Sequence, residues 1–236
     1  MSKIGNLLDK YKNRRQVVKE SLENHYKQDI YSPINSGSYA KHTAINTKFD
    51  LDIVVPFKRT SFSKIQDMFE DTYDFLCDEF SDTAEVRKQK VSIGVIFLED
   101  DDGDEIDIDV VPGREINEEN YPDDKELNIY FNDDKWGFSK GSYTKTNIQA
   151  QIDHIRNTGD ERHDIRRIIR LLKIWKRENH PKDYKSFFFE LITIKAFKNE
   201  DLTGDLWEKL KTVMKYISNN VILKDFALKD PGNTNN

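Results

Sequence analysis

Apolar residues recur every three or four positions along most of the chain, a spacing that is typical of amphipathic helices. In the first segment the residues with this spacing are Ile4, Leu8, Tyr11, Val18, Leu22 and Tyr26. The same spacing returns between residues 61 and 80 and, from residue 147 onward, continues almost without interruption. The pattern predicts helices over residues 1–25, 61–80, 147–158, 164–179, 186–197 and 205–221.

Three apolar runs of a different kind predict strands. The β-branched run FDLDIVVPF at 49–57 ends at a proline and is typical of a buried strand. The runs VSIGVIFL at 91–98 and IDIDVVPG at 106–113 flank an Asp-Gly turn, which is a strong hairpin signal. A short strand is also predicted at 128–131, within a stretch, 114–146, that otherwise has the composition of loops.

The order of these elements predicts an α+β protein with two lobes. The N-terminal lobe, residues 1–145, combines a mixed sheet with helices, and the C-terminal lobe, residues 146–236, is helical. The first helix is expected on the outside and is long enough to span both lobes. Because clefts between lobes commonly hold small-molecule sites, we expect the active site in such a cleft.

Composition narrows the functional classes. The 236 residues include 37 basic and 43 acidic side chains, so the formal net charge is −6, which argues against stable DNA binding by bulk charge. The single cysteine, Cys77, excludes an internal disulfide and a cysteine-rich zinc site. The sequence contains no apolar run long enough to span a bilayer and no signal-peptide stretch, so we expect a cytoplasmic protein without a membrane partner.

Paired aspartates are the strongest candidates for chemistry. Asp50 and Asp52 alternate along one predicted strand, and Asp107 and Asp109 repeat the pattern on another, so each pair points to one side of its strand. If the strands are neighbours, the carboxylates converge, and Mg²⁺ would relieve their repulsion. An isolated pair would favour a solvated strand face, but the adjoining apolar runs favour a metal site for Asp50 and Asp52.

Gly37 and Ser38 stand about twelve residues before Asp50. The segment SGSYAKHTAINTKFDLDIVV, which includes Gly37, Ser38 and Thr43, resembles the G-S-x(n)-[DE]-x-D signature of DNA polymerase β-like nucleotidyltransferases. Its fuller form resembles the bacterial cGAS/DncV-like nucleotidyltransferases (CD-NTases). The resemblance implies a polymerase β-like core in which Gly37, Ser38 and Thr43 bind the nucleotide.

Three further residues follow from the same resemblance. The third carboxylate of the family precedes V-V-P, which selects Asp109. The segment RRIIRLLKIWKRE resembles a family helix whose lysine, here Lys173, contacts the donor triphosphate, and KSFFFELI resembles a segment whose serine, here Ser186, contacts phosphate or sugar. Simpler alternatives are that Lys173 is one more cation on a basic helix and that Ser186 caps the next helix. Trp175 is expected in the core.

The resemblance implies an enzyme that uses two Mg²⁺ ions, with Mn²⁺ able to substitute, held by Asp50, Asp52 and Asp109. Its substrates would be nucleoside triphosphates, ATP among them, and its product a cyclic or short linear oligonucleotide second messenger, sensed by an effector protein in anti-phage signalling. The zinc insertion of animal cyclic GMP-AMP synthases has no counterpart, so activation by long double-stranded DNA is not implied.

Two rival interpretations remain at this stage. One is a template-independent RNA nucleotidyltransferase of the CCA-adding or poly(A)-adding kind, although such enzymes usually need further RNA-binding domains. The other is a catalytically inactive nucleotide-binding module, against which the complete set of aspartates argues. The final residues, FALKDPGNTNN, resemble a segment that in relatives precedes further helices, so the sequence is expected to be either truncated or a short family member.

Overall fold

The computed structural model describes residues 3–45, 51–98, 103–132, 142–179 and 184–233. The chain divides into two compact units: the first comprises residues 1–40 and 49–149, and the second comprises residues 41–48 and 150–236. The second unit therefore includes a short segment from the N-terminal half, which the expected lobes of 1–145 and 146–236 did not assign to it. The reason is chemical, because Lys41 and Thr43 are hydrogen-bonded to residues of the C-terminal helices.

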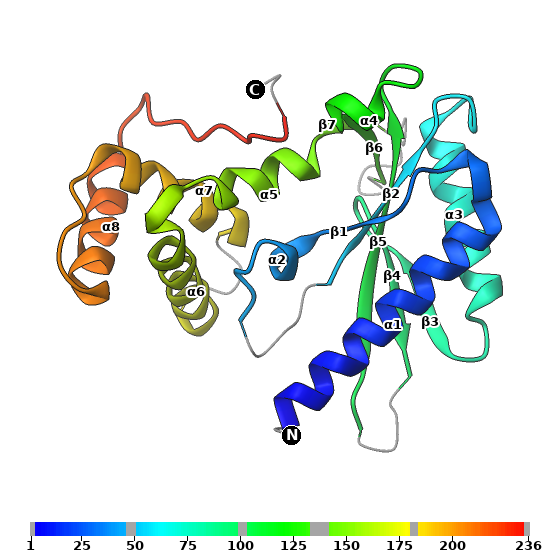
Figure 1. Ribbon diagram of the computed structural model, residues 1–236, viewed down its shortest axis with the longest axis horizontal. Helices are drawn as coiled ribbons and strands as arrows, with labels where there is room; N and C mark the ends of the chain where they lie inside the picture. The colour runs from blue at the N-terminus through cyan, green and yellow to red at the C-terminus, as the bar shows by residue number, and fades with distance from the viewer. Residues whose placement is uncertain (1–2, 46–50, 99–102, 133–141, 180–183, 234–236) are drawn as a thin grey trace. The chain divides into compact units, whose positions relative to one another are not determined.

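The first unit is built on a mixed seven-stranded sheet with the order β1-β2-β5-β4-β3, in which β6 pairs with β5 and with β7 (Figure 1). Strands β2 and β5 are parallel, and the other pairs are antiparallel. The strands are β1 (Ile34–Asn35), β2 (Ile53–Phe57), β3 (Ala84–Lys88), β4 (Ile93–Phe97), β5 (Ile106–Glu115), β6 (Leu127–Phe131) and β7 (Ser142–Thr146).

The predicted strands are confirmed where the structure describes them. Strands β4 and β5 form the predicted hairpin, with Phe97 opposite Ile106, and β6 lies where the short strand was expected. Strand β2 begins at Ile53, whereas the first residues of the predicted strand, 49 and 50, lie outside the described residues. Strands β1, β3 and β7 were not predicted. Strand β1 has only two residues, and the sequences of β3 and β7, AEVRK and SYTKT, are largely polar and only partly buried.

The predicted helices are also confirmed, with ends that differ by a few residues. They are α1 (Lys3–Tyr26), α3 (Ile65–Glu79), α5 (Ile148–Arg156), α6 (Arg162–Asn179), α7 (Ser186–Asn199) and α8 (Leu206–Asn220). Two single-turn helices, α2 (Gly37–Ala40) and α4 (Tyr121–Asp124), lie in stretches expected to be turns or loops. Short 3-10 helices occupy residues Lys27–Asp29 and Gly159–Glu161.

One face of the sheet packs against α1 and α3 and forms the larger core (Figure 1). The helices contribute apolar residues such as Leu22 and Phe69, and alternate residues of β2, β4 and β5, such as Ile108, complete the cluster. Successive residues of a strand point to opposite faces, so Asp107 and Asp109 lie on the face away from α1. The burial of β5 alternates accordingly between buried isoleucine and half-buried aspartate.

The second unit has its own core, in which α6, α7 and α8 pack through residues such as Leu172, Ile192 and Val213. The prediction that Trp175 belongs to the core is wrong, because Trp175 is 40% exposed and its ring contacts the edge of the core, at Phe189. Gln151 of α5 donates to both carboxylate oxygens of Asp230, at 3.1 and 3.2 Å, which ties the C-terminal segment to the helices. Within the described ranges, no helix is both long enough and apolar enough to cross a bilayer.

Candidate active site

The parallel pairing of β2 and β5 places two of the predicted site residues next to each other. Ile53 is aligned with Val110, so the same register, continued one residue back, places Asp52, just before β2, beside Asp109. Aligned residues of neighbouring strands are about 5 Å apart and point to the same face of the sheet. Both aspartates are half-buried. The condition for converging carboxylates, that the two strands are neighbours, is therefore met.

The glycine–serine turn lies at the same end of β2. Strand β1 pairs antiparallel with β2, and the backbone N–H of Ser36 donates to the carbonyl of Asp52 at 2.7 Å. The next residue, Gly37, has a φ of 73°, a left-handed conformation that favours glycine, and it begins α2 together with Ser38. The chain thus returns from β1 through Gly37 and Ser38 beside Asp52. Asp50 lies outside the described residues.

Asp107 and Asp109 share one face of β5 but have different partners. The guanidinium of Arg87 donates to Oδ2 of Asp107 at 3.3 Å, so Asp107 takes part in an ion pair at the surface. Oδ1 of Asp107 is buried and has no hydrogen-bond partner within the described residues. Asp109 instead accepts a hydrogen bond from the neutral side-chain amide of Gln89, at 2.7 Å from Nε2 to Oδ1.

The donor set on this face suits a hard divalent cation. Mg²⁺ prefers oxygen ligands and usually binds one or two carboxylates together with substrate phosphates. Asp52 and Asp109 offer two carboxylates side by side, and a cation between them would relieve their repulsion. No group of three potential ligands from His, Cys, Asp and Glu is present among the described residues, but the expected third ligand, Asp50, is not one of them.

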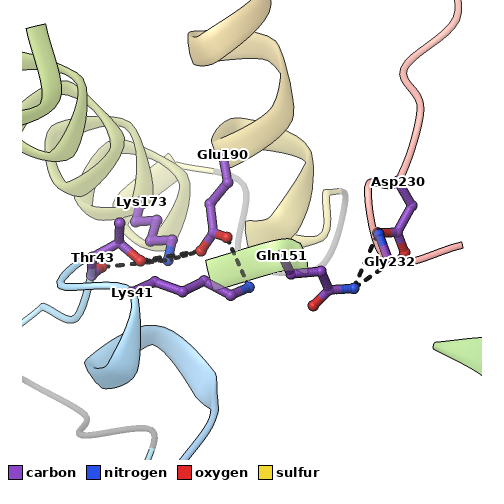
Figure 2. A network of polar contacts seen from close by, with 7 residues as sticks. All are labelled: Lys41, Thr43, Gln151, Lys173, Glu190, Asp230 and Gly232. Atoms are coloured by element: carbon purple, nitrogen blue, oxygen red, sulfur yellow. Dashed lines mark hydrogen bonds and ion pairs between the residues drawn. The ribbon is translucent and has the colours of Figure 1, made fainter. Parts of the chain in front are cut away.

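The second unit contains a buried polar network centred on Glu190 of α7, shown in Figure 2. Its carboxylate accepts hydrogen bonds from Nζ of Lys173 at 2.7 Å, Nζ of Lys41 at 2.9 Å and Oγ1 of Thr43 at 3.1 Å. Lys173 also donates to Oγ1 of Thr43 at 3.0 Å. Two of the predicted nucleotide-binding residues, Lys173 and Thr43, are thus brought together by a glutamate that sequence analysis did not single out.

The network carries a net positive charge, because it contains two ammonium groups and only one carboxylate. Burial alone would raise the pKa of Glu190, but the positive charges of Lys41 and Lys173 outweigh it and hold the pKa below its usual value. Lys173 is 7% exposed and Thr43 is fully buried, so the structure keeps both side chains within the unit. An anion next to the network would find an excess of positive charge.

Ser186 is the first residue of α7, four residues before Glu190, and is exposed. Residues four apart on a helix lie on the same face, so Ser186 stands one turn away from the glutamate. The alternative that Ser186 caps this helix is wrong, because the residue at the N-cap position is Lys185 and no side-chain cap is formed.

Gln89, Lys41 and Glu190 are not among the site residues that the sequence predicts. Glu190 could have been found, because it is the only acidic residue in the largely apolar segment SFFFELITIKAF, and a buried carboxylate needs a partner. One of its partners, Lys41, is 149 residues away, and the segment in which Lys41 lies gives no sign of this contact. Gln89 has no local signal either, because its contact with Asp109 depends on the pairing of three strands.

Comparison with known proteins identifies the family. Residues 6–151 match the model of the Second Messenger Oligonucleotide or Dinucleotide Synthetase domain. This match covers more than half of the chain, and the protein belongs to this family. The family assignment agrees with the resemblance to the CD-NTases.

The CBASS oligonucleotide cyclase CdnC of Escherichia coli (strain KTE188) is 25% identical to the chain over 218 residues. The alignment covers 86% of this chain and 62% of the relative, so the chain spans somewhat less than two thirds of that protein.

Solved structures establish the same fold. A STING-associated CdnE c-di-GMP synthase from Capnocytophaga granulosa superposes with a TM-score of 0.71 at 15% identity, covering 94% of this chain and 69% of the other. The CdnC of E. coli MS115-1, solved with ATP, gives 0.67 at 22% identity, covering 97% and 77%. The predicted α+β, polymerase β-like fold with a helical C-terminal part is therefore confirmed.

Proposed function

We propose that this protein is a metal-dependent nucleotidyltransferase that makes a cyclic or short linear oligonucleotide second messenger from nucleoside triphosphates. The observation that carries the proposal is the parallel pairing of β2 with β5, whose register places Asp52, the residue before β2, beside Asp109 of β5, in a chain of the second-messenger synthetase family. Phosphoryl transfer depends mainly on positioning and charge neutralisation, so a few carboxylates on a rigid sheet suffice for its centre.

In this proposal the first unit holds the metal-binding carboxylates. Asp50 and Asp52 would hold divalent cations, two Mg²⁺ ions or Mn²⁺ in their place, and Asp109 would join them as the ligand nearest the acceptor hydroxyl. Cations bound there would supply the charge that activates an attacking hydroxyl and stabilises a leaving pyrophosphate. Gly37 would let a phosphate approach the backbone, with the hydroxyl of Ser38 as a donor.

The second unit would supply nucleotide-binding cations. Lys173, together with Lys41, would provide positive charge for the triphosphate, which the excess of ammonium groups over carboxylate in their network supports. Thr43 would orient Lys173 through the hydrogen bond between Oγ1 and Nζ. Ser186, exposed at the start of α7, would donate to phosphate or sugar.

The relatives support the substrate class and the biological role. One relative, CdnC, was solved with ATP, and another is named a c-di-GMP synthase, so we propose nucleoside triphosphates, ATP among them, as substrates here. We further propose that the product acts in anti-phage signalling through an effector protein that senses it.

The test is incubation of the full chain with Mg²⁺ and each α-labelled nucleoside triphosphate, followed by phosphatase treatment and chromatography. A labelled product whose mobility phosphatase leaves unchanged supports cyclisation, and a ladder of labelled products whose mobility shifts when phosphatase removes their terminal phosphates supports linear oligonucleotides. Extension of an added RNA would indicate instead the template-independent RNA nucleotidyltransferase. No product with any triphosphate or pair of triphosphates would indicate an inactive nucleotide-binding module.

A further inference from the structure

Gln89 follows directly after β3 and reaches across β4 to a residue of β5. Its Nε2 lies 2.7 Å from Oδ1 of Asp109, although β3 and β5 are not neighbours in the sheet. The strand between them carries Gly94 at the crossing point, because Gly94 is paired with Asp109 on one side and with Arg87 on the other. The hydrogen bond therefore links residues of non-adjacent strands over the surface of the sheet.

The contact depends on the absence of a side chain at position 94. A Cβ added to Gly94 would lie 2.7 Å from Nε2 of Gln89, closer than non-bonded atoms approach each other. This atom is the end of a flexible side chain, so an alanine would displace the amide rather than the backbone; its Cβ would also lie 3.3 Å from Nε of Arg87, a smaller conflict. Glycine at this position thus leaves the path from Gln89 to Asp109 open.

The amide of Gln89 is itself held in place. Gln89 and Ser92 form the corners of the turn between β3 and β4, with the N–H of Gln89 donating to the carbonyl of Ser92 at 2.8 Å. The hydroxyl of Ser92 donates to Oε1 of Gln89 at 3.2 Å. Because Oε1 accepts from Ser92, the amide nitrogen is directed away from the serine and toward Asp109.

We propose that Gln89 is a positioning residue for Asp109, which fixes the rotation of its carboxylate so that the group is oriented to bind a divalent cation. The inference rests on the proposed function, since it assumes that Asp109 is a metal ligand. Partners of metal ligands commonly fix ligand orientation in this way, and their loss typically weakens metal affinity 10-fold to 100-fold. Gly94 and Ser92 support this role: Gly94 leaves room for the side chain of Gln89, and Ser92 orients its amide.

The neighbouring pair, Arg87 and Asp107, provides a matched control. Arg87 is two residues before Gln89, and its side chain also passes over Gly94, to Asp107, which is two residues before Asp109. The two contacts share strands, direction and sheet face. Removal of Arg87 therefore removes a cross-strand contact with Asp107 and leaves the hydrogen bond from Gln89 to Asp109 in place.

The experiment compares the wild-type chain with Gln89→Met, Gly94→Ala and Arg87→Met. Methionine approximates the length of each side chain and removes the donor. Binding of Mn²⁺ alone is measured by electron paramagnetic resonance, and the Mg²⁺ dependence of product formation is measured in parallel. Thermal melts check that each variant is folded.

We expect Gln89→Met to weaken Mn²⁺ binding about 10-fold or more and to raise the half-saturating Mg²⁺ concentration similarly, with kcat largely recovered at saturating Mg²⁺. Gly94→Ala should shift both quantities in the same direction, and Arg87→Met should leave both within about twofold of wild type.

The positioning role and the proposed function can fail separately. Equal Mn²⁺ affinity in Gln89→Met and wild type, an equal loss in Arg87→Met, or no Mn²⁺ binding by wild type would overturn the role of Gln89. A wild-type chain that forms no product would overturn the proposed function, whereas the Mn²⁺ measurement would still decide whether Gln89 positions Asp109.

Discussion

Asp109 in the first unit and Glu190 in the second are both acidic residues in largely apolar elements, yet their surroundings differ. Glu190 is buried and accepts hydrogen bonds from two lysines and a threonine, so the helical unit itself compensates its charge. Asp109 is half-buried, accepts from the neutral amide of Gln89 and lies in register beside a second carboxylate, Asp52. One acid is surrounded by cations, and the other is placed next to a like charge.

The difference separates two uses of a carboxylate. A carboxylate that is buried among lysines stabilises the packing of the segments that carry them. If it is removed, the lysines stay buried without a counter-charge, which destabilises the fold. Two acids held side by side destabilise the protein slightly and gain from a bound cation. The comparison therefore predicts that substitutions in the sheet affect activity far more than stability, and that substitutions at Glu190 affect stability first.

The largest effect is expected for Asp52→Ala. Loss of a ligand that contacts both cations should reduce product formation below detection, and Asp50→Ala should do the same. Because removal of Asp52 also removes repulsion with Asp109, the melting temperature should stay equal or rise. Melts and product assays on the same preparations test this, and retained turnover in either variant would refute the two-metal assignment.

Asp109→Asn and Asp107→Asn test the comparison within one strand. Asp109→Asn should lower kcat on the order of 10³-fold or more while nucleotide binding is largely retained. Asp107→Asn should change kcat only a few-fold, because Asp107 is paired with Arg87 and lies one strand repeat away, about 7 Å from Asp109. Steady-state kinetics and nucleotide titrations measure both. A reversed order of severity would remove Asp109 from the site.

Glu190→Ala should be the most destabilising of these substitutions. It leaves Lys41 and Lys173 buried without their carboxylate, which typically costs about 3–5 kcal/mol in the free energy of unfolding. Adding Lys41→Met and Lys173→Met to Glu190→Leu should recover most of the loss, since an apolar set of similar volume needs no counter-charge. Urea unfolding gives the values, and a loss below about 1 kcal/mol for Glu190→Ala would show that the lysines find another anion.

Much of the fold could be predicted from the sequence because its signals are local. Helical spacing located the long helices, and the Asp-Gly turn located the β4–β5 hairpin. Strand β3 escaped prediction because its residues, AEVRK, are mostly charged and partly exposed, so its pairing with β4 is what makes it a strand. The sequence predicts converging carboxylates only if their two strands are neighbours, and the structure shows that β2 and β5 pair in parallel.

The candidate site was predictable only as far as its residues lie in motifs. Asp52, Asp109, Lys173 and Ser186 stand in short recognisable segments, and Lys41 and Glu190 lie in the same segments without a marked role, whereas Gln89 lies in none of them. Gln89 acquires its contact from three paired strands and a glycine, and Lys41 meets Glu190 because the segment after α2 packs with α6 and α7. Such partners depend on long-range packing, which spacing along the chain does not encode.

The smallest expected effect concerns pH and sharpens the assignment of Glu190 as a compensated acid. Because its lysine neighbours hold the pKa of Glu190 below the usual value of 4.5, the carboxylate stabilises the fold above that pH. This stabilisation should be lost as pH falls below 4.5, through the lowered pKa of the folded state, with a slope of at most about 1.4 kcal/mol per pH unit for one proton.

Glu190→Gln should abolish this contribution, so the difference in unfolding free energy between wild type and variant should shrink below pH 4.5. Lys41→Met, which removes one of the two positive charges that lower this pKa, should shift the loss of stability to higher pH. Urea unfolding of the three proteins between pH 7 and pH 3 measures these changes, and a difference independent of pH would mean that Glu190 contributes through packing alone.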